Sequence, residues 1–243
     1  MDAIGIIPAR YGSTRFEGKV LADLLGKPVI QHVWENARRA ASLEDLIVAT
    51  DDARILETVR GFGGKAVMTA KEHRTGTDRL REVANPLDTK IVVNIQADEP
   101  LLHPSMIDDV VTPLLQDREL MISTLRKKIT DDEDLRNPSV VKVVTDKNGY
   151  ALYFSRSAIP FPRFHDNVVF YKHIGLYGFK KDFLFTFTNL PTSALEGAEG
   201  LEQLRVLENG YRIKVAETQF DTIGIDTPED LQRAREALTS RSL

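Results

Sequence analysis

A short apolar run followed at once by a basic, glycine-containing loop constrains the fold of this chain more than any other stretch. Residues 4–7 read Ile-Gly-Ile-Ile, which is too short and too apolar for an amphipathic helix and predicts a buried parallel strand ending at Pro8. The loop that follows can bring its backbone close to a ligand and present several donors to an anion. We therefore expect a cradle for a nucleotide triphosphate. The glycines, hydroxyls and cations of this loop are Arg10, Gly12, Ser13, Thr14, Arg15, Gly18 and Lys19.

An ordinary strand-to-helix loop with solvated basic residues is the alternative interpretation, because short glycine motifs also arise by chance. The loop is not a Walker A motif, since Lys19 is followed by Val20 rather than by serine or threonine. It does not match the Gly-x-Gly-x-x-Gly dinucleotide fingerprint either.

Composition excludes several classes of function. The 243 residues are 42% hydrophobic and 28% charged, which suits one large globular α/β domain. The net charge of −4 argues against nucleic acid as a partner, so the clustered cations indicate a local anionic ligand. The absence of cysteine rules out disulfides and thiolate chemistry. We see neither a signal peptide nor a membrane-length apolar run, so we expect a cytoplasmic protein with no membrane partner.

Alternating strand and helix patterns predict a mostly parallel sheet flanked by helices. Strand-like runs occupy 46–49, 66–68, 91–95 and 122–125. The later half differs, because Asn148-Gly149 between two strand patterns is a strong hairpin signal. An apolar stripe with residues 30, 33, 34, 37 and 41 predicts a helix after Pro28, with Trp34 in the core.

Carboxylates stand at two places where such a sheet binds ligands. Asp98 comes just past the central strand 91–95, and carboxyl ends of parallel strands face the ligand crevice. Magnesium prefers carboxylates together with substrate phosphates, so Asp98 is a candidate ligand. Glu99 is expected to be solvated. Asp226 lies one residue outside a well-formed helix start at Thr227-Pro228 and is free to face a ligand.

Three further patterns leave two interpretations each. The turn before 76–84 can hold an anion or a base edge, or Thr75 can simply cap the helix. His173, Gly175 and Tyr177 share one strand face, which is usually structural. Asp51 or Asp52 caps the next helix rather than binding metal. A helix after Ser193 is expected to carry Leu201, Leu204 and Leu207 on one face, with Glu202, Gln203 and Arg205 off that face.

Eight segments in order resemble the 3-deoxy-manno-octulosonate cytidylyltransferase family along essentially the whole chain. Each segment alone is weak, but the ordered set is highly specific. The segments are Ile7-Pro-Ala-Arg-Tyr-Gly-Ser-Thr-Arg15 with Gly18-Lys19, Val48-Ala-Thr-Asp-Asp52, Thr75-Gly-Thr-Asp-Arg79, Asn94-Ile-Gln-Ala-Asp-Glu-Pro100, Ala151-Leu-Tyr-Phe-Ser-Arg156, His173-Ile-Gly-Leu-Tyr177, Leu201-Glu-Gln-Leu-Arg205 and Asp226-Thr-Pro-Glu-Asp230.

The resemblance implies a fold, a reaction and an assembly. The fold is α/β and nucleotide-diphospho-sugar transferase-like, with a small antiparallel dimerisation arm near 150–177. The reaction is CTP + Kdo → CMP-Kdo + pyrophosphate, which needs Mg²⁺ and serves lipopolysaccharide biosynthesis, and the enzyme is a homodimer. A single domain, 1–243, would have a nucleotide part to about 130, a sugar-acid part with the arm at about 131–220, and a returning metal-site segment at about 221–243.

The resemblance also implies a role for each matching residue. It assigns catalysis to Arg10, Arg15, Lys19 and Asp98, and metal binding to Asp98 and Asp226. It assigns nucleotide binding to Ala9, Arg10, Gly12, Ser13, Lys19, Thr75, Gly76, Asp78 and Gln96. It assigns sugar-acid binding to Arg156, His173, Tyr177, Glu202 and Gln203. No residue is assigned as general base.

Two departures from the family pattern concern the site. Glu17 stands where the family has proline, so its charge should point outward or meet a cation, and Ala97 replaces a glycine beside Asp98. The sugar could therefore be Kdo or its 8-amino-3,8-dideoxy analogue, whose ammonium could pair with Glu17. A CMP-sialate-type synthetase and a non-catalytic nucleotide-binding protein are the remaining alternatives. The pattern at Arg156 and 173–177 argues against the first, and retention of both aspartates argues against the second.

Overall fold

The computed structural model describes residues 1–13, 15–73, 75–164 and 168–241. These residues form two compact units, which we describe separately: Met1–Asp108 together with the chain from Phe220 onward, and Asp109–Gln219. Helix α4 (Pro104–Gln116) contains the boundary between them. The expected assignment of a nucleotide part, a sugar-acid part and a metal-site segment stays a prediction.

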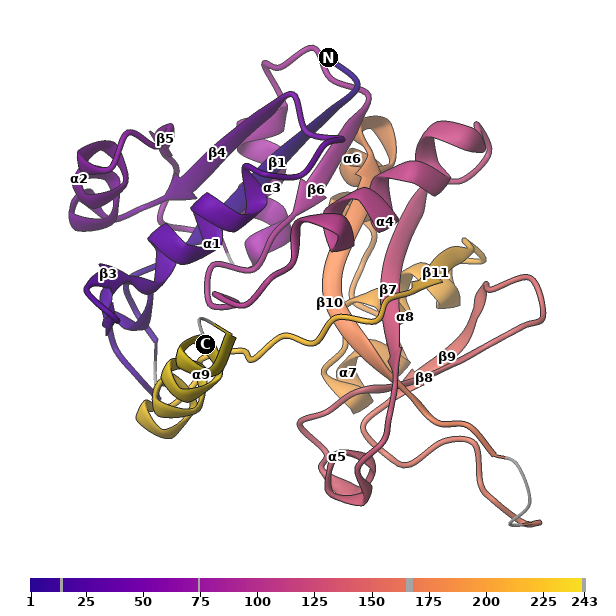
Figure 1. Ribbon diagram of the computed structural model, residues 1–243. Coiled ribbons are helices and arrows are strands. Elements are labelled where there is room, and N and C mark those ends of the chain that lie inside the picture. Colours follow the sequence, from indigo (N-terminus) through magenta and orange to yellow (C-terminus); the bar gives the residue numbers. More distant parts are fainter. Residues whose placement is uncertain (14, 74, 165–167, 242–243) are drawn as a thin grey trace. The chain divides into compact units, whose positions relative to one another are not determined.

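A parallel sheet forms the centre of the first unit (Figure 1). Its strands are β1 (Ala3–Ala9), β4 (Asp45–Thr50), β5 (Ala66–Met68) and β6 (Ile91–Asn94), in the spatial order β6-β1-β4-β5. The apolar runs of β1, β4 and β6 are almost entirely buried, as a parallel sheet covered on both faces requires. Chain order reverses between β1 and β6, and a ligand crevice opens at such a switch point beyond the carboxyl ends of the strands.

Short elements and helices complete the first unit. The basic loop ends in a 3-10 turn η1 (Lys19–Leu21), followed by β2 (Asp23–Leu24) and β3 (Lys27–Pro28). Helices α1 (Val29–Ala37), α2 (Ala53–Gly61), α3 (Gly76–Ala84) and α9 (Pro228–Arg241) follow in chain order. Asp52 caps α2, which confirms the capping interpretation for the 51–52 pair.

The apolar stripe predicted for α1 is confirmed except at two positions. Ile30, Val33 and Ala37 are fully buried. Trp34 is half-buried beside Phe62, with ring centroids 5.6 Å apart, rather than in the core. The stripe also ends early, because α1 stops at Ala37 and residue 41 is exposed beyond it.

Helix α9 returns the end of the described chain to the first unit. Its start is the predicted capping arrangement: the Thr227 N–H donates to the Asp230 carboxylate at 2.9 Å, and the Asp230 N–H donates to the Thr227 hydroxyl at 3.3 Å. Ile225 and Ala234 are buried in a cluster with Leu24 and other apolar residues. This cluster fixes the position of the segment that carries Asp226.

The second unit is built on a mixed sheet. Strand β7 (Ile122–Lys128) pairs antiparallel with β10 (Tyr171–Lys180) and parallel with β11 (Ile213–Glu217). Strands β8 (Lys142–Thr145) and β9 (Ala151–Ser155) form the predicted hairpin, and Gly149 supplies the positive φ of 76° that its turn needs (Figure 1). The mixed α/β class and the antiparallel hairpin are thus confirmed, while the dimerisation role of the hairpin stays a prediction.

Short helices of the second unit correct one predicted face. These are α5 (Asp132–Arg136), α6 (Lys181–Asn189), α7 (Ala194–Glu199) and α8 (Gln203–Glu208). Gln203, which was predicted to lie off the leucine face, is buried together with Leu204 and Val206. The chain breaks at Gly200, which is left-handed with φ of 63°, and α8 therefore starts a new rotational phase. No helix in the described ranges is long and apolar enough to cross a bilayer.

The surroundings of Gly178 in β10 leave no room for a larger side chain, so a substitution there reports on the packing of the second unit. A Cβ at this position would lie 2.8 Å from Leu114 Cδ1, 3.0 Å from Ser123 Oγ and 3.1 Å from the Val110 carbonyl oxygen. We expect Gly178→Ala to lower the free energy of unfolding by about 1–3 kcal/mol, because an overpacked site forces its neighbours to move. Gly175→Ala in the same strand is the control, since a Cβ there meets nothing within 4 Å. Equal denaturant midpoints for the two variants would contradict the packing.

Candidate active site

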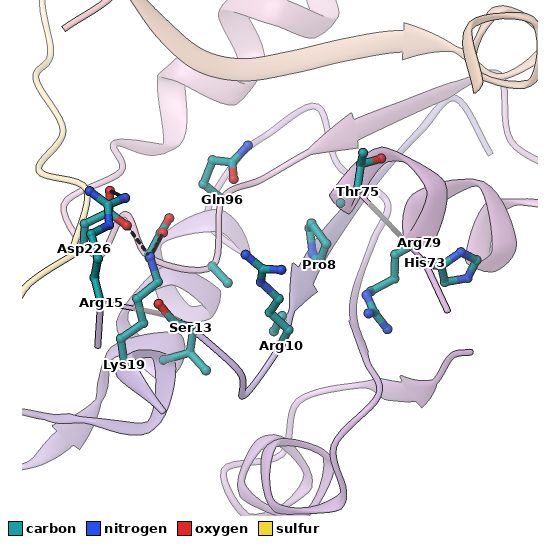
Figure 2. A pocket seen from close by; sticks show the side chains of 15 residues that line it. Pro8, Arg10, Ser13, Arg15, Lys19, His73, Thr75, Arg79, Gln96 and Asp226 are labelled. Atoms are coloured by element: carbon teal, nitrogen blue, oxygen red, sulfur yellow. Dashed lines mark hydrogen bonds and ion pairs between the residues drawn. The ribbon is translucent and has the colours of Figure 1, made fainter. Parts of the chain in front are cut away.

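A cavity of about 400 Å³ lies in the first unit, where β1 and β6 end (Figure 2). This volume is within the usual range of small-molecule sites. Figure 2 shows Arg15, Lys19 and Asp226 gathered at one end and His73 and Thr75 at the other, with Arg10 and Gln96 between them. The lining residues are Pro8, Ala9, Arg10, Ser13, Arg15, Lys19, Val20, His73, Thr75, Gly76, Arg79, Gln96, Ala97, Asp98 and Asp226.

Most of the residues predicted for the nucleotide and metal line this one cavity. They come from the loop after β1, the start of α3, the turn after β6 and the segment before α9. Gly12 and Asp78 are the predicted members outside the lining. Thr14, in the predicted cradle, and Arg74, in the turn before α3, lie outside the described residues.

Lys19 bridges the two predicted metal ligands. Its Nζ lies 2.5 Å from Asp98 Oδ2 and 2.8 Å from Asp226 Oδ1, although these residues are far apart in sequence. Arg15 Nη2 makes a second ion pair, 2.8 Å from Asp226 Oδ2. The turn that delivers Lys19 depends on Gly18, whose φ of 69° is left-handed and would strain another residue.

The bridge sets the charge state of Lys19. Burial alone would lower the pKa of Lys19, but attraction to Asp98 and hydrogen bonds to both carboxylates outweigh burial and raise it. The side chain is 14% exposed and stays protonated at neutral pH. Two carboxylates that converge on one ammonium nitrogen are a donor set that also suits a divalent cation.

Two carboxylates suit magnesium better than they suit a metal whose ligands all come from protein side chains. Among the described residues, no group of three or more histidine, cysteine, aspartate and glutamate side chains is placed to hold an ion. Magnesium typically takes one or two carboxylates and completes its shell with water and substrate phosphates. Asp98 and Asp226, beside a basic loop, provide that arrangement.

Glu99 is not a solvated residue, which corrects the prediction. Its side chain is half-buried, and desolvation, reinforced by the negative charge of Asp98, raises the pKa of Glu99 to about 8. A hydrogen bond with Thr222 partly offsets this rise. Glu99 is therefore largely protonated at neutral pH and adds little negative charge beside Asp98.

The turn before α3 acts first as a helix cap. The Asp78 N–H donates to the Thr75 hydroxyl at 3.1 Å, and the Thr75 N–H donates to the Asp78 carboxylate at 3.2 Å. This reciprocal box confirms the capping interpretation and explains why Asp78 is outside the lining. Thr75 and Gly76 still border the cavity.

Arg79 is a lining residue that the sequence analysis did not assign to the site. Its guanidinium is buried and pairs with Asp51 at 2.8 Å, and it also donates to the Thr69 hydroxyl. An arginine beside a Thr-Gly-Thr-Asp helix start was a usable signal, but the partner at position 51 could not be found without the fold. The ion pair connects the end of β4 to α3 and supports the wall of the cavity.

The five residues predicted for the sugar acid all belong to the second unit. Arg156 is bound by the backbone: its guanidinium donates to the carbonyls of Glu199 at 2.7 Å and Pro138 at 3.0 Å. Glu202 lies 3.5 Å from Arg205 Nη2 and Gln203 is buried. Their predicted contact with a sugar stays a prediction.

His173 and Tyr177 lie together on β10, with ring centroids 5.3 Å apart. Burial lowers the pKa of His173 to about 3, so the imidazole is neutral at physiological pH. The Thr124 hydroxyl lies 2.9 Å from the Leu176 carbonyl, to which it can donate, and 2.8 Å from His173 Nε2. Burial also raises the pKa of Tyr177 well above its usual value.

Of the two departures from the family pattern, one lines the cavity and the other does not. Ala97 is buried and lines the cavity next to Asp98. Glu17 is exposed and outside the lining, and its charge acts on Arg54. The first of the two expectations for Glu17, that its charge points outward, is confirmed by its exposure.

The neutral, buried state of His173 predicts an acid-side loss of stability. The folded-state pKa is about 3 and the unfolded one about 6.5, so the unfolded chain binds the extra proton first. The free energy of unfolding should fall as pH drops from about 6.5 toward 3, by up to about 4–5 kcal/mol from this residue. His173→Gln, which keeps a donor for Thr124, should flatten this dependence in urea unfolding followed across the same pH range. Identical slopes would show that His173 is not buried in its neutral form.

The fold and the cavity define a nucleotidyltransferase: a parallel sheet with a basic loop and paired carboxylates at its switch point. A family model described as Cytidylyltransferase matches residues 4–214. The chain belongs to the 3-deoxy-manno-octulosonate cytidylyltransferase family. A member from Geotalea uraniireducens (strain Rf4) is 53% identical over 98% of this chain and 99% of its own length. One from Geotalea daltonii (strain DSM 22248 / JCM 15807 / FRC-32) is 52% identical over 99% and 100%.

A solved structure agrees with these relatives. CMP:2-keto-3-deoxy-manno-octonic acid synthetase complexed with CTP matches this chain with a TM-score of 0.94 and 43% sequence identity, covering 100% of both chains. The nucleotidyltransferase class and the family that the sequence segments indicated are thereby confirmed.

Proposed function

We propose that this protein is a cytidylyltransferase that joins CTP and Kdo to give CMP-Kdo and pyrophosphate. The full-length match to a synthetase solved with CTP carries this proposal. The cavity supports it, because the three cations of the basic loop, the start of α3 and two carboxylates surround one space of a size suited to a nucleotide. CMP-Kdo made in this way would serve lipopolysaccharide biosynthesis, and we place the reaction in the cytoplasm, where free CTP is found.

The transfer needs positioning more than covalent chemistry. The anomeric hydroxyl of the sugar attacks the α-phosphorus in line; a new O–P bond forms, the bond to the β-phosphate oxygen breaks, and the hydroxyl proton leaves to solvent. Arg10, Arg15 and Lys19 bind the triphosphate and stabilise the charge that develops on departing pyrophosphate. Ala9, Ser13, Gly12, Thr75, Gly76, Asp78 and Gln96 are assigned to the nucleotide, and Arg156, His173, Tyr177, Glu202 and Gln203 to the sugar acid.

We assign Asp98 and Asp226 as the residues that hold Mg²⁺. When bound, the ion supplies neutralisation of phosphate charge and a lower pKa for a nearby hydroxyl. The carboxylates themselves give up Lys19 and Arg15, which then become available to phosphate oxygens. The ion pairs in the nucleotide-free protein and the phosphate contacts in the complex are thus alternatives for the same two cations.

A homodimer is the proposed assembly. The second unit exposes large apolar side chains near its hairpin, with Leu152 62%, Phe161 84% and Phe164 78% exposed. Exposed apolar groups of this size are typical of interaction surfaces. The resemblance implies a dimerisation arm near 150–177, in this part of the chain.

Product mass from a sugar panel with CTP tests the proposed reaction. We expect CMP-Kdo from Kdo, pyrophosphate release that needs both sugar and Mg²⁺, and loss of turnover by about 100-fold or more in Asp98→Asn. The substituted side chain keeps its shape, and the Asp98 carbonyl still accepts from the Ile225 N–H at 2.9 Å, so the fold should persist. Thermal melting checks the fold.

Other outcomes of this panel would replace the proposal. Product from the 8-amino analogue alone, or from a sialic acid alone, would identify a different sugar. CTP binding with no product from any sugar would indicate a non-catalytic nucleotide-binding protein. Full Mg²⁺-dependent turnover in Asp98→Asn would remove the metal role of Asp98.

Lys19 should compete with Mg²⁺ in the nucleotide-free protein. Because its ammonium occupies the space between Asp98 and Asp226, we expect Lys19→Met to tighten Mg²⁺ binding by about twofold to fivefold in calorimetry without nucleotide, the range of a partly exposed ion pair. Lys27→Met is the control, since Lys27 also loses an ion pair, 2.7 Å from Glu35, but does not line the cavity. Equal Mg²⁺ affinity in wild type and Lys19→Met would contradict the competition.

A further inference from the structure

The loop that carries the cavity's cations has an anchor on its outer side. Tyr11 follows Arg10 in this loop but does not line the cavity. The Arg54 guanidinium carbon lies 3.3 Å from the centre of the Tyr11 ring. This is a stacking distance between two planar groups and qualifies as a cation–π contact.

Arg54 is held in place by the start of its own helix. Its Nε and Nη2 donate to the two carboxylate oxygens of Asp52, at 2.9 and 2.7 Å. The Arg54 backbone N–H donates to the same carboxylate at 2.9 Å, which makes Asp52 the N-cap of α2. A two-point Arg–carboxylate pair fixes the plane of the guanidinium, so the ring meets an oriented partner.

The sheet register explains why these groups meet. Strands β1 and β4 are parallel neighbours, with Ala9 paired to Thr50. Tyr11 and Asp52 each come two residues after that pair, so both leave the sheet at the same edge. Helix α2 also contacts η1, the turn that begins with Lys19.

The Tyr11 ring also touches the other end of the loop. The Gly18 N–H donates to the Tyr11 carbonyl at 2.9 Å. A Cβ on Gly18 would lie 2.9 Å from Tyr11 Cε2, so the ring packs directly on the glycine backbone. The ring therefore closes the loop between 11 and 18 and contacts α2 through Arg54.

Glu17 adds a negative charge that is felt by the same guanidinium. The pKa of Arg54 is raised, first by its hydrogen bond to Asp52 and also by the negative charges of Asp52 and Glu17. Glu17 is exposed and lies on the outer side of the loop, away from the lining. The negative residue of an anion-binding loop thus acts on the cation that anchors the loop from outside.

We propose that Arg54 is a positioning residue for the triphosphate loop: held by Asp52, its guanidinium stacks on Tyr11 and holds the described loop residues, 10–13 and 15–18, in the conformation that presents Arg10, Ser13 and Lys19 to the cavity. Arg54 does not touch the nucleotide. The effect on CTP rests on the proposed function, whereas the effect on the loop does not.

Two single variants and their combination test this role. Arg54→Met removes the cation, and Tyr11→Leu removes the ring but keeps the cation and the Asp52 pair. We expect each to raise KM for CTP by about twofold to fivefold, the range of an exposed cation–π contact, with kcat changed less than twofold. The double variant should be no weaker than Tyr11→Leu, because Tyr11→Leu already removes the contact that Arg54→Met removes. Tyr11→Phe, which keeps the ring, should retain the wild-type KM.

Hydrogen exchange of the nucleotide-free protein gives a readout that needs no activity. Amides of the segment 10–18 should exchange about twofold to fivefold faster in Arg54→Met and in Tyr11→Leu, but not in Tyr11→Phe. Arg60→Met is the matched control, since it removes an exposed cation from the same helix. Melting temperatures of all variants report whether each one folds.

Each other result overturns the positioning role. Weak CTP binding in Arg54→Met together with wild-type behaviour in Tyr11→Leu would mean that Arg54 acts through its charge. Unchanged hydrogen exchange of the loop in both Arg54→Met and Tyr11→Leu would mean that the Arg54–Tyr11 contact does not stabilise the loop conformation. If wild-type protein fails to turn over CTP with Kdo, the proposed function is wrong, and the exchange data still decide whether Arg54 holds the loop.

Discussion

The ion-paired junction of Lys19 with Asp98 and Asp226 is the interaction on which the site depends. It joins the loop after β1, the turn after β6 and the segment before α9, which are three separate parts of the chain. Two carboxylates this close would repel each other without a cation between them. Lys19 is that cation here, and it brings the two carboxylates together in the arrangement that the proposed metal role of Asp98 and Asp226 requires.

Apolar packing beneath the junction decides where its charges lie. Leu24, Leu101 and Ile225 are buried together, and each stands close in sequence to one of the three segments that meet above. The Ile225 N–H donates to the Asp98 carbonyl at 2.9 Å, so the two aspartates are linked through the backbone as well. Ion pairs that are partly exposed contribute little stability by themselves. The apolar core and the backbone hydrogen bond therefore fix the positions of Lys19, Asp98 and Asp226, and the ion pairs form because these positions are already close.

The sequence predicted the elements and most of the cavity because local patterns and chain order were sufficient for both. The run at 4–7, the hairpin turn at Gly149 and the cap at Thr227 each depend on neighbours within a few residues, and all three are confirmed. Predictions failed at residues whose burial is decided by contacts with distant parts of the chain. Trp34 lies beside Phe62 instead of in the core, Gln203 is buried because α8 restarts after Gly200, and Glu99 is desolvated rather than hydrated. The pairing of Arg79 with Asp51, and of Tyr11 with Arg54, depends on which residues of neighbouring strands lie side by side. That register could not be inferred from the sequence.

The cations of the cavity differ in what each must give up to bind a phosphate. Arg10 is exposed and, among the described residues, makes no ion pair, so an anion can approach it without breaking an existing contact. Lys19 must leave two carboxylates and Arg15 must leave one. An anion that drew Lys19 away from Asp98 and Asp226 would leave two carboxylate charges uncompensated, which costs free energy. A divalent cation held by Asp98 and Asp226 would offset that cost. This distribution of charges supports the proposal that a polyphosphate binds together with a divalent cation.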